Sequence, residues 1–218
     1  MIDLYFWATP NSMKVLIALE ELGTKYNIVP INIYKKEHLT KDYKEINPTH
    51  KLPAIIDHGN KKGEEALVLY ESNAILVYLA ESNKKLLPFA NSSDKYNCHK
   101  WLSWQSSHFA PSIQTKNLDE VKYYYDILED HMRDKRYLCG QEFSISDIAL
   151  FPWIDKYSSH EININMYPHT KEWYYRVFDR ESVKKAKEIA QHFTKNSYFS
   201  DESKEFLVKN APDKNKTS

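Results

Sequence analysis

A proline at the start of an apolar strand constrains this chain more than any other feature of its sequence. The sequence KLPAII spans residues 51–56, and Pro53 stands where the apolar run begins. Because proline has no N–H to give to a sheet ladder, Pro53 belongs at the first residue of a strand or at a bend. If the Leu52–Pro53 bond is cis, the N–H and C=O of Leu52 turn away from the sheet. They can then pair with an extended peptide.

A second segment follows about twenty residues later, where ESNAI at residues 71–75 opens a helix directly after an apolar strand. A helix that begins at Glu71 and Ser72 offers free backbone N–H groups, a hydroxyl and the positive end of its dipole. These groups favour a carboxylate. One segment therefore suits a peptide backbone and the other suits an α-carboxylate, and a small acidic peptide such as glutathione satisfies both.

The first third of the chain predicts the order strand, helix, strand, helix, strand, strand, helix. The strands are expected at residues 2–7, 26–33, 53–57 and 66–69, and the helices at 15–22, 40–46 and 72–82. This alternation implies parallel strands followed by an antiparallel hairpin. The polar residues 58–63 are expected to form the hairpin turn.

The rest of the chain shows helical periodicity and no strand pattern. The expected helices lie at residues 96–108, 118–132, 146–157, 168–178 and 181–193. Pro111 is expected to end or kink the first of them. Ser144 precedes an apolar helix and has Asp147 three residues later, which predicts a capping box with Asp in place of Glu.

These patterns predict two domains: an α/β domain at residues 1–83 and an all-helical domain at residues 95–218. A polar linker at residues 84–94 separates them, and residues 213–218 are expected to fray. The two cysteines, Cys98 and Cys139, are expected to be free and buried, with Cys139 at a loop and therefore the more reachable.

Composition argues against several classes of function. Lysine plus arginine and aspartate plus glutamate both total 30, so the net charge is zero. This balance argues against a nucleic-acid binder and against a polybasic membrane-surface protein. Mean hydropathy is −0.66, and no run approaches the roughly 18 apolar residues of a spanning helix. The N-terminus lacks the basic and apolar regions of a signal peptide, so we expect a soluble cytoplasmic protein.

Three motifs together resemble the glutathione S-transferase superfamily: KLPAI at residues 51–55, ESNAI at 71–75 and SISD at 144–147. Within it, MIDLYF at residues 1–6 and TPN at 9–11 resemble the bacterial nu-class enzymes, which are glutathione-dependent disulfide-bond reductases. The resemblance implies a thioredoxin-like domain followed by a helical bundle. It also implies a homodimer that uses glutathione as co-substrate.

The resemblance further implies roles for the two opening motifs. Leu52 pairs its backbone with the cysteinyl unit of glutathione, with Pro53 in the cis form. Glu71 and Ser72 hold the γ-glutamyl group. From the residues alone, Pro53 could equally be a strand-edge proline, and the Glu71–Ser72 pair could be a plain helix start.

Four further residues take roles from the same resemblance. Lys51 and His38 lie near the glycyl carboxylate, and Thr9 and Asn11 lie near the sulfur. Nu-class relatives often carry a different polar residue at the place of His38. Lys51 could also be simply solvated.

The chemistry of the site requires a thiolate rather than a thiol. Lowering a thiol pKa by about 2 units takes about 2.7 kcal/mol, and one donor to an anion supplies about 1.5–3 kcal/mol. A single donor from Thr9 or Asn11 is therefore enough. Both residues could instead merely cap the first helix. Ser12 is a further candidate donor, as in serine-type transferases, and Tyr5 matches the tyrosine of tyrosine-type classes.

The helical domain offers Trp104, His108 and Tyr124 as candidates for a second-substrate cleft. Aromatic side chains at helical spacing more often belong to a core, which is the alternative interpretation. No group of histidines and acidic residues has the spacing of a metal site.

The sequence thus predicts an enzyme in which bound glutathione, as thiolate, reduces a disulfide or attacks an electrophilic small molecule. Because residues 11 and 12 hold no cysteine, glutathione itself is expected to supply the sulfur, and two glutathione molecules can cycle to the oxidised dimer. A conjugating serine-type transferase is one alternative. A non-catalytic interaction protein with the same fold is the other.

Overall fold

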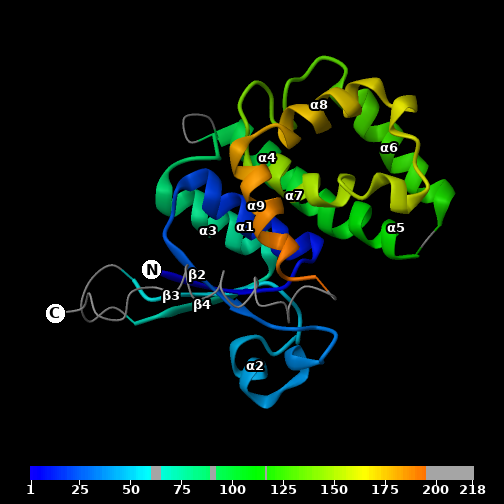
Figure 1. The fold of residues 1–218 in the computed structure, drawn as a ribbon. Helices are drawn as coiled ribbons and strands as arrows, with labels where there is room; N and C mark the ends of the chain where they lie inside the picture. The colour runs from blue at the N-terminus through cyan, green and yellow to red at the C-terminus, as the bar shows by residue number, and fades with distance from the viewer. Residues whose placement is uncertain (60–64, 89–91, 116, 195–218) are drawn as a thin grey trace. The chain divides into compact units, whose positions relative to one another are not determined.

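The computed structural model describes residues 1–59, 65–88, 92–115 and 117–194 (Figure 1). These residues form two compact units, one from Met1–Ile75 with the described part of Lys184–Ser218, the other from Leu76–Val183. The predicted linker at 84–94 is already helical from Ser92 onwards. The predicted domain boundaries stay a prediction, and the expected hairpin turn and frayed end lie partly or wholly outside the described residues.

The first unit is built on a four-stranded sheet with the strand order β2-β1-β3-β4. Its strands are β1 (Ile2–Phe6), β2 (Tyr26–Pro30), β3 (Ala54–Asp57) and β4 (Leu67–Tyr70). β1 and β2 are parallel, whereas β3 pairs antiparallel with both β1 and β4. The expected parallel pair followed by a hairpin is confirmed, and with it the thioredoxin-like fold class.

Helix α1 (Pro10–Leu22) connects the two parallel strands, and its sequence specifies both of its ends. Thr9 is the N-cap, and Pro10 occupies the first turn, where its missing N–H costs nothing. Gly23 ends the helix at a φ of 64°, the left-handed conformation that glycine adopts without steric cost.

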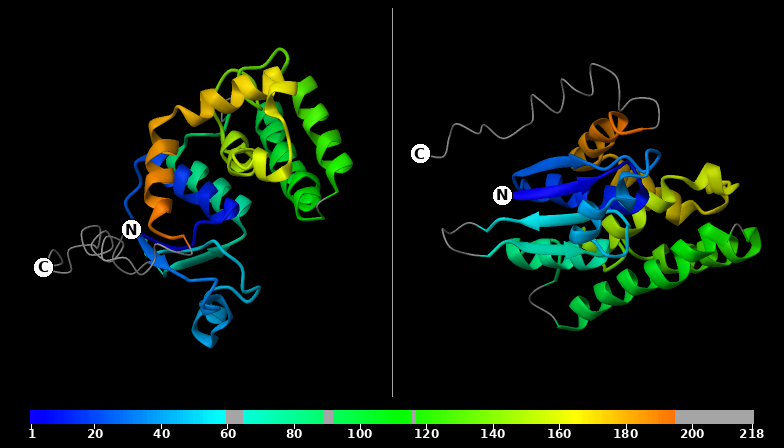
Figure 2. Two further views of the ribbon diagram at one scale, coloured as in Figure 1. Left: turned by 45° about the vertical axis from the view of Figure 1, so that its right-hand side comes forward. Right: turned by 90° about the horizontal axis from the view of Figure 1, so that it is seen from below.

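The two faces of the sheet are covered by different elements. Figures 1 and 2 show α1 and the beginning of α3 (Ser72–Asn83) on one face. The short helices η1 (Glu37–Leu39) and α2 (Lys41–Ile46) lie on the other. Phe6 of β1 meets Phe193 edge-to-face with ring centroids 5.4 Å apart. This ring contact packs the residue that follows α9 (Glu181–Gln191) by two positions against β1.

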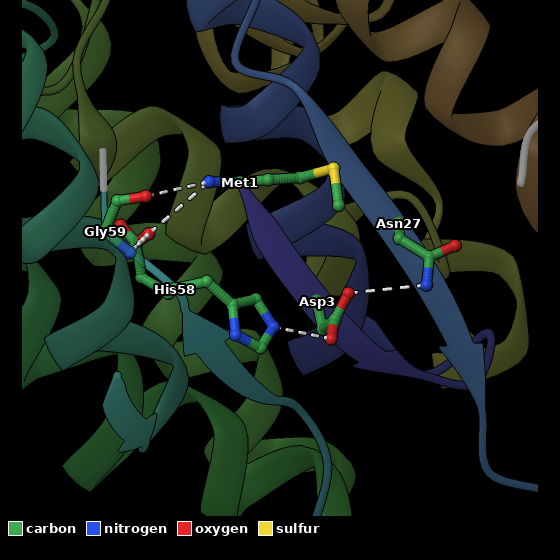
Figure 3. A network of polar contacts seen from close by, with 6 residues as sticks. Met1, Asp3, Asn27, His58 and Gly59 are labelled. Carbon is green, nitrogen blue, oxygen red and sulfur yellow. Dashed lines mark hydrogen bonds and ion pairs between the residues drawn. The ribbon is translucent and has the colours of Figure 1, made fainter. Parts of the chain in front are cut away.

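A polar network holds together one end of the sheet (Figure 3). His58 Nε2 lies 2.8 Å from Asp3 Oδ2, and Asn27 donates to the other carboxylate oxygen of Asp3 over 3.3 Å. The N-terminal amine of Met1 reaches the carbonyl of Gly59 at 3.5 Å. These contacts join β1, β2 and the segment after β3. They lie where β1 starts and β3 ends, which is the end of the sheet opposite to the predicted site.

The second unit is helical in its described part, as the sequence predicted. After the end of α3 it contains α4 (Ser92–Trp104), α5 (Ala110–Thr115), α6 (Leu118–Met132), α7 (Ile145–Ile154), α8 (Pro168–Phe178) and the first residues of α9 (Glu181–Gln191). Short 3₁₀ turns, η3 (Tyr157–His160) and η4 (Ile164–Met166), separate α7 from α8. Every residue of α7 is buried, and α7 packs against α4 and α8.

Pro111, which was expected to end or kink the first long helix, does not end it: the winding changes before the proline and the chain continues as α5. The π-helical turn η2 (Gln105–Phe109) lies between α4 and α5. Proline cannot donate to the carbonyl four residues earlier, and its ring clashes with that carbonyl. A π turn immediately before the proline widens the helix there, so the chain continues as α5.

The predicted capping box is present and belongs to a larger buried network. Asp147 accepts from the N–H of Ser144 over 3.0 Å and from its hydroxyl over 2.9 Å. It also accepts from the N–H of Leu138 at 2.9 Å and from Trp173 Nε1 at 2.8 Å. One carboxylate therefore holds the start of α7, the preceding loop and α8. No helix in the described ranges is long and apolar enough to cross a membrane.

We expect Asp147→Ala to lower the free energy of unfolding by about 3 kcal/mol or more, because it leaves several buried donors unpaired. Ser144→Ala, which removes only the cap hydroxyl, is expected to cost about 1 kcal/mol. Urea denaturation measures both. The matched control is Asp130→Ala on the exposed face of α6, expected to change stability by less than about 0.5 kcal/mol. Equal losses for Asp147→Ala and Asp130→Ala would contradict the network.

Candidate functional site

The antiparallel register brings three loop segments to one end of the sheet. Tyr5 of β1 is opposite Ala54 of β3, which is in turn opposite Tyr70 of β4. The C-terminal ends of β1 and β4 therefore flank the N-terminal end of β3. The segments at this end carry the predicted site residues Thr9, Asn11, Ser12, Leu52, Pro53, Glu71 and Ser72. Motifs as far apart in sequence as Thr9 and Ser72 thus converge.

The peptide bond between Leu52 and Pro53 is cis, as predicted. Pro53 is buried at the beginning of β3. The carbonyl of Lys51 accepts from the Tyr43 hydroxyl and from Asn47 Nδ2, both at 2.7 Å. The backbone N–H and C=O of Leu52 make no hydrogen bond to another residue in the described part of the chain. This leaves the backbone N–H and C=O of Leu52 able to pair with an added peptide.

Glu71 and Ser72 form the transition from β4 into α3. Glu71 has a φ of 70°, a left-handed conformation that costs a non-glycine residue roughly 1–2 kcal/mol. Its carbonyl accepts the first helical hydrogen bond, from the N–H of Ile75. The first N–H groups of α3 have no acceptor within the helix and carry the positive end of its dipole. The geometry suits a carboxylate at Ser72.

A buried lysine reaches the same helix start. Lys14 on α1 is 1% exposed, and its Nζ donates to Ser72 Oγ at 3.2 Å and to Asn73 Oδ1 at 3.1 Å. Burial lowers the pKa of Lys14 to about 7, against the opposing attraction of Glu71. No motif marked this residue. The sequence offered one sign of a buried lysine: Lys14 stands three residues before Ile17, so the two side chains share the apolar face of the helix.

Thr9 and Ser12 form a hydroxyl pair at the start of α1. Thr9 Oγ1 accepts from the N–H of Ser12 over 3.3 Å, and the two hydroxyl oxygens are 3.0 Å apart. Ser12 is fully buried, whereas Thr9 and Asn11 are half-buried. The Thr9 hydroxyl donates to Ser12 Oγ, and because capping uses only a lone pair of Thr9 Oγ1, the same proton is free to turn to a ligand instead. The cap and a sulfur donor are compatible in one residue.

The two residues predicted near the glycyl carboxylate come from two segments, His38 from η1 and Lys51 from the loop before β3. His50 Nδ1 is 2.8 Å from the carbonyl of His38, which places the η1 segment beside Lys51. Lys51 is exposed and His38 is half-buried. Their contact with a ligand stays a prediction.

The three residues predicted for the second substrate form a contact cluster in the second unit. The rings of Trp104 and Tyr124 are 5.8 Å apart, and those of His108 and Tyr124 are 6.0 Å apart. Trp104 also meets Phe109 of the π turn. The cluster is partly exposed rather than buried, with His108 exposed and Trp104 and Tyr124 half-buried. Its role stays a prediction.

A separate pocket of about 360 Å³ in the second unit is lined in part by Leu86, Asp94, Cys139 and Phe143, and by none of the aromatic cluster residues. Cys98 is buried and Cys139 half-buried, and both are free thiols. The hydrogen bond with Cys98 and burial raise the pKa of the Cys139 thiol, which makes it a poor nucleophile. The described residues hold no cluster of three or more histidine, cysteine or acidic side chains that fits a metal ion.

Comparison with known proteins identifies the family. The model of the glutathione S-transferase N-terminal domain matches residues 8–82, and that of the C-terminal domain matches residues 81–181. The disulfide-bond oxidoreductase YfcG of Escherichia coli (strain K12) is 32% identical over 203 residues, covering 85% of this chain and 94% of that protein. The chain therefore belongs to the glutathione S-transferase family.

Two solved structures of glutathione transferases share the fold. A family member from Pseudomonas fluorescens pf-5, with two glutathione molecules bound, matches with a TM-score of 0.79 and 28% identity. The match covers 85% of this chain and 91% of that one. A glutathione transferase from Pseudomonas putida, with one glutathione disulfide bound per subunit, has a TM-score of 0.79 and 26% identity over 85% and 90% of the two chains.

We expect Lys14 to make stability depend on pH. From pH 7 to about 10 the unfolded chain keeps a proton on Lys14 that the folded chain has released. The unfolding free energy of the wild type therefore gains up to about 1.4 kcal/mol per pH unit relative to Lys14→Met in this window. Urea unfolding of both proteins at several pH values measures the difference. Parallel pH profiles would contradict a buried, titrating lysine.

Proposed function

We propose that this protein is a glutathione-dependent disulfide-bond reductase that uses a bound glutathione thiolate. The observation that carries the proposal is the convergence of Thr9, Leu52 and Ser72 at one end of the sheet. There, the backbone of Leu52 suits the cysteinyl unit of glutathione, and the start of α3 suits its α-carboxylate. The Thr9–Ser12 hydroxyl pair suits its sulfur. Relatives with bound glutathione and with a disulfide-bond oxidoreductase name support it.

Each part of glutathione then has a partner of suitable chemistry. The cysteinyl unit pairs with the backbone of Leu52, and the α-carboxylate of the γ-glutamyl unit meets Ser72 and the first N–H groups of α3. We propose that Glu71 accepts from the glutamyl amino group. Lys51 and His38 lie on the side of the glycyl carboxylate.

The sulfur is activated by hydrogen bonding rather than by a general base. A donor to the thiolate contributes about 1.5–3 kcal/mol, enough to lower the thiol pKa by roughly one to two units. We assign this donor to Thr9, with Asn11 beside it. Ser12 acts behind Thr9: its fully buried hydroxyl accepts from Thr9 Oγ1 at 3.0 Å, and we propose that on ligand binding this bond reverses, so that Ser12 donates to Thr9 and the Thr9 proton turns toward sulfur.

Disulfide reduction then balances with two glutathione molecules. The bound thiolate attacks one sulfur of the substrate disulfide, which forms a glutathione mixed disulfide and releases the other sulfur as a thiolate that takes up a proton. A second glutathione thiolate attacks the mixed disulfide, giving glutathione disulfide and a second substrate thiol. We further propose that Trp104, His108 and Tyr124 contact the second substrate. Their rings offer it a flat apolar surface with polar groups at its edge.

The thiolate donor is tested by steady-state reduction of hydroxyethyl disulfide beside conjugation of an aryl halide. We expect disulfide reduction to dominate. Thr9→Val is expected to lower its kcat/KM roughly ten- to hundredfold, the cost of one lost donor to an anion, whereas Thr9→Ser retains most activity. Ser12→Ala is expected to have a smaller effect than Thr9→Val.

The control for lost capping is Asn117→Ala. Asn117 caps α6 by accepting an N–H over 3.3 Å, the same length as the Thr9 cap. It is expected to cost stability but no more than about twofold in rate. Dominant conjugation with sensitivity only to Ser12→Ala would instead identify a serine-type conjugating transferase. Absence of glutathione binding at millimolar concentration would favour a non-catalytic interaction protein.

Dimerisation is also proposed from membership of the family. We expect sedimentation velocity at micromolar concentration to report a species of about twice the 25.8 kDa chain mass. A stable monomer over that range would contradict this expectation.

A further inference from the structure

The start of α3 carries more positive charge than a simple helix cap needs. Lys14 is buried, and its ammonium group lies within hydrogen-bond distance of Ser72 and Asn73, at the positive end of the helix dipole. A buried cation is costly, and a helix N-terminus beside it adds to the cost. Both costs fall when an anion binds at the same place.

The hydrogen bonds also determine which way the Ser72 hydroxyl points. An ammonium group has three donors and no acceptor, so while Lys14 is charged, Ser72 Oγ must accept from it. The proton of the hydroxyl is then directed to another acceptor, such as a carboxylate. A neutral Lys14 amine can accept that proton instead, which turns the lone pairs of Ser72 toward the ligand and repels a carboxylate.

We propose that Lys14 is a positioning residue of the glutathione site, which orients the Ser72 hydroxyl as a donor and couples carboxylate binding to proton uptake. This inference rests on the proposed function, because it takes the glutamyl carboxylate of glutathione as the anion at α3. Glu71 is the charged neighbour that opposes the loss of the proton.

The coupling has a defined sign. The pKa of Lys14 is about 7 in the free protein, and a carboxylate at Ser72 raises it. Below pH 7 Lys14 is already charged and binding takes up no proton there. Above pH 7 binding takes up part of a proton, so affinity falls as pH rises through this range. Asn73, whose carbonyl oxygen accepts from Lys14, can keep this hydrogen bond in either charge state, because a neutral amine still has two N–H donors.

The test is isothermal titration with S-methylglutathione, which has no thiol to ionise. Titration at pH 7.5 in two buffers of different ionisation enthalpy counts the protons taken up. We expect the wild type to take up between about half and one proton more than Lys14→Met or Lys14→Arg. Comparison between variants cancels the protons of histidines and of the ligand amino group. Lys14→Met is expected to bind roughly tenfold more weakly at pH 6.5.

Lys14→Arg keeps the charge but cannot release its proton, so it is expected to bind with nearly constant affinity from pH 6.5 to 8.5. If Lys14→Met does not fold, comparison of Lys14→Arg with the wild type still tests whether Lys14 takes up a proton on binding. Proton uptake in Lys14→Arg equal to that of the wild type would overturn the role of Lys14, as would binding by the wild type without uptake. Failure of the wild type to bind at all would overturn the proposed function itself, which is a distinguishable result.

Discussion

The antiparallel pairing of β3 with β1 and β4 is the constraint on which the site depends. One register, Tyr5 opposite Ala54 and Ala54 opposite Tyr70, places the end of β1, the start of β3 and the end of β4 at the same edge. A shift of one residue would exchange the buried and exposed faces of each strand. The buried Leu4 and Ile55 therefore fix the register that aligns the three segments of the candidate site.

The site is assembled mainly from backbone and helix ends, with few charged side chains. The Leu52 backbone and the first turn of α3 are positioned by secondary structure, and Ser72 and Thr9 add hydroxyl groups. Such groups change little when a ligand arrives, which favours binding by a preorganised site. Lys14 is the exception, because its charge state responds to the ligand. It connects α1 directly to the start of α3.

Much of this arrangement follows from the sequence because its signals are local. Pro53 marks a strand start, Ser144 and Asp147 mark a capped helix, and alternation of strands and helices gives the sheet topology. Two features could not be predicted from the sequence. No sequence pattern before Pro111 marks the π turn at Gln105–Phe109, because the winding of a helix depends on its packing as well as on a nearby proline. The role of Lys14 depends on Ser72, fifty-eight residues away, and only the fold brings them together.

The most direct test of the site is a two-dimensional NMR titration of the backbone amides of the protein with glutathione. The account predicts that the amides of Leu52, Ser72 and Asn73, together with those beside Thr9, shift at a common midpoint below millimolar concentration. The network around Asp3 and His58, at the other end of the sheet, is predicted to stay unchanged. Shifts confined to the Trp104, His108 and Tyr124 cluster, or none at all, would contradict a glutathione site at this edge of the sheet.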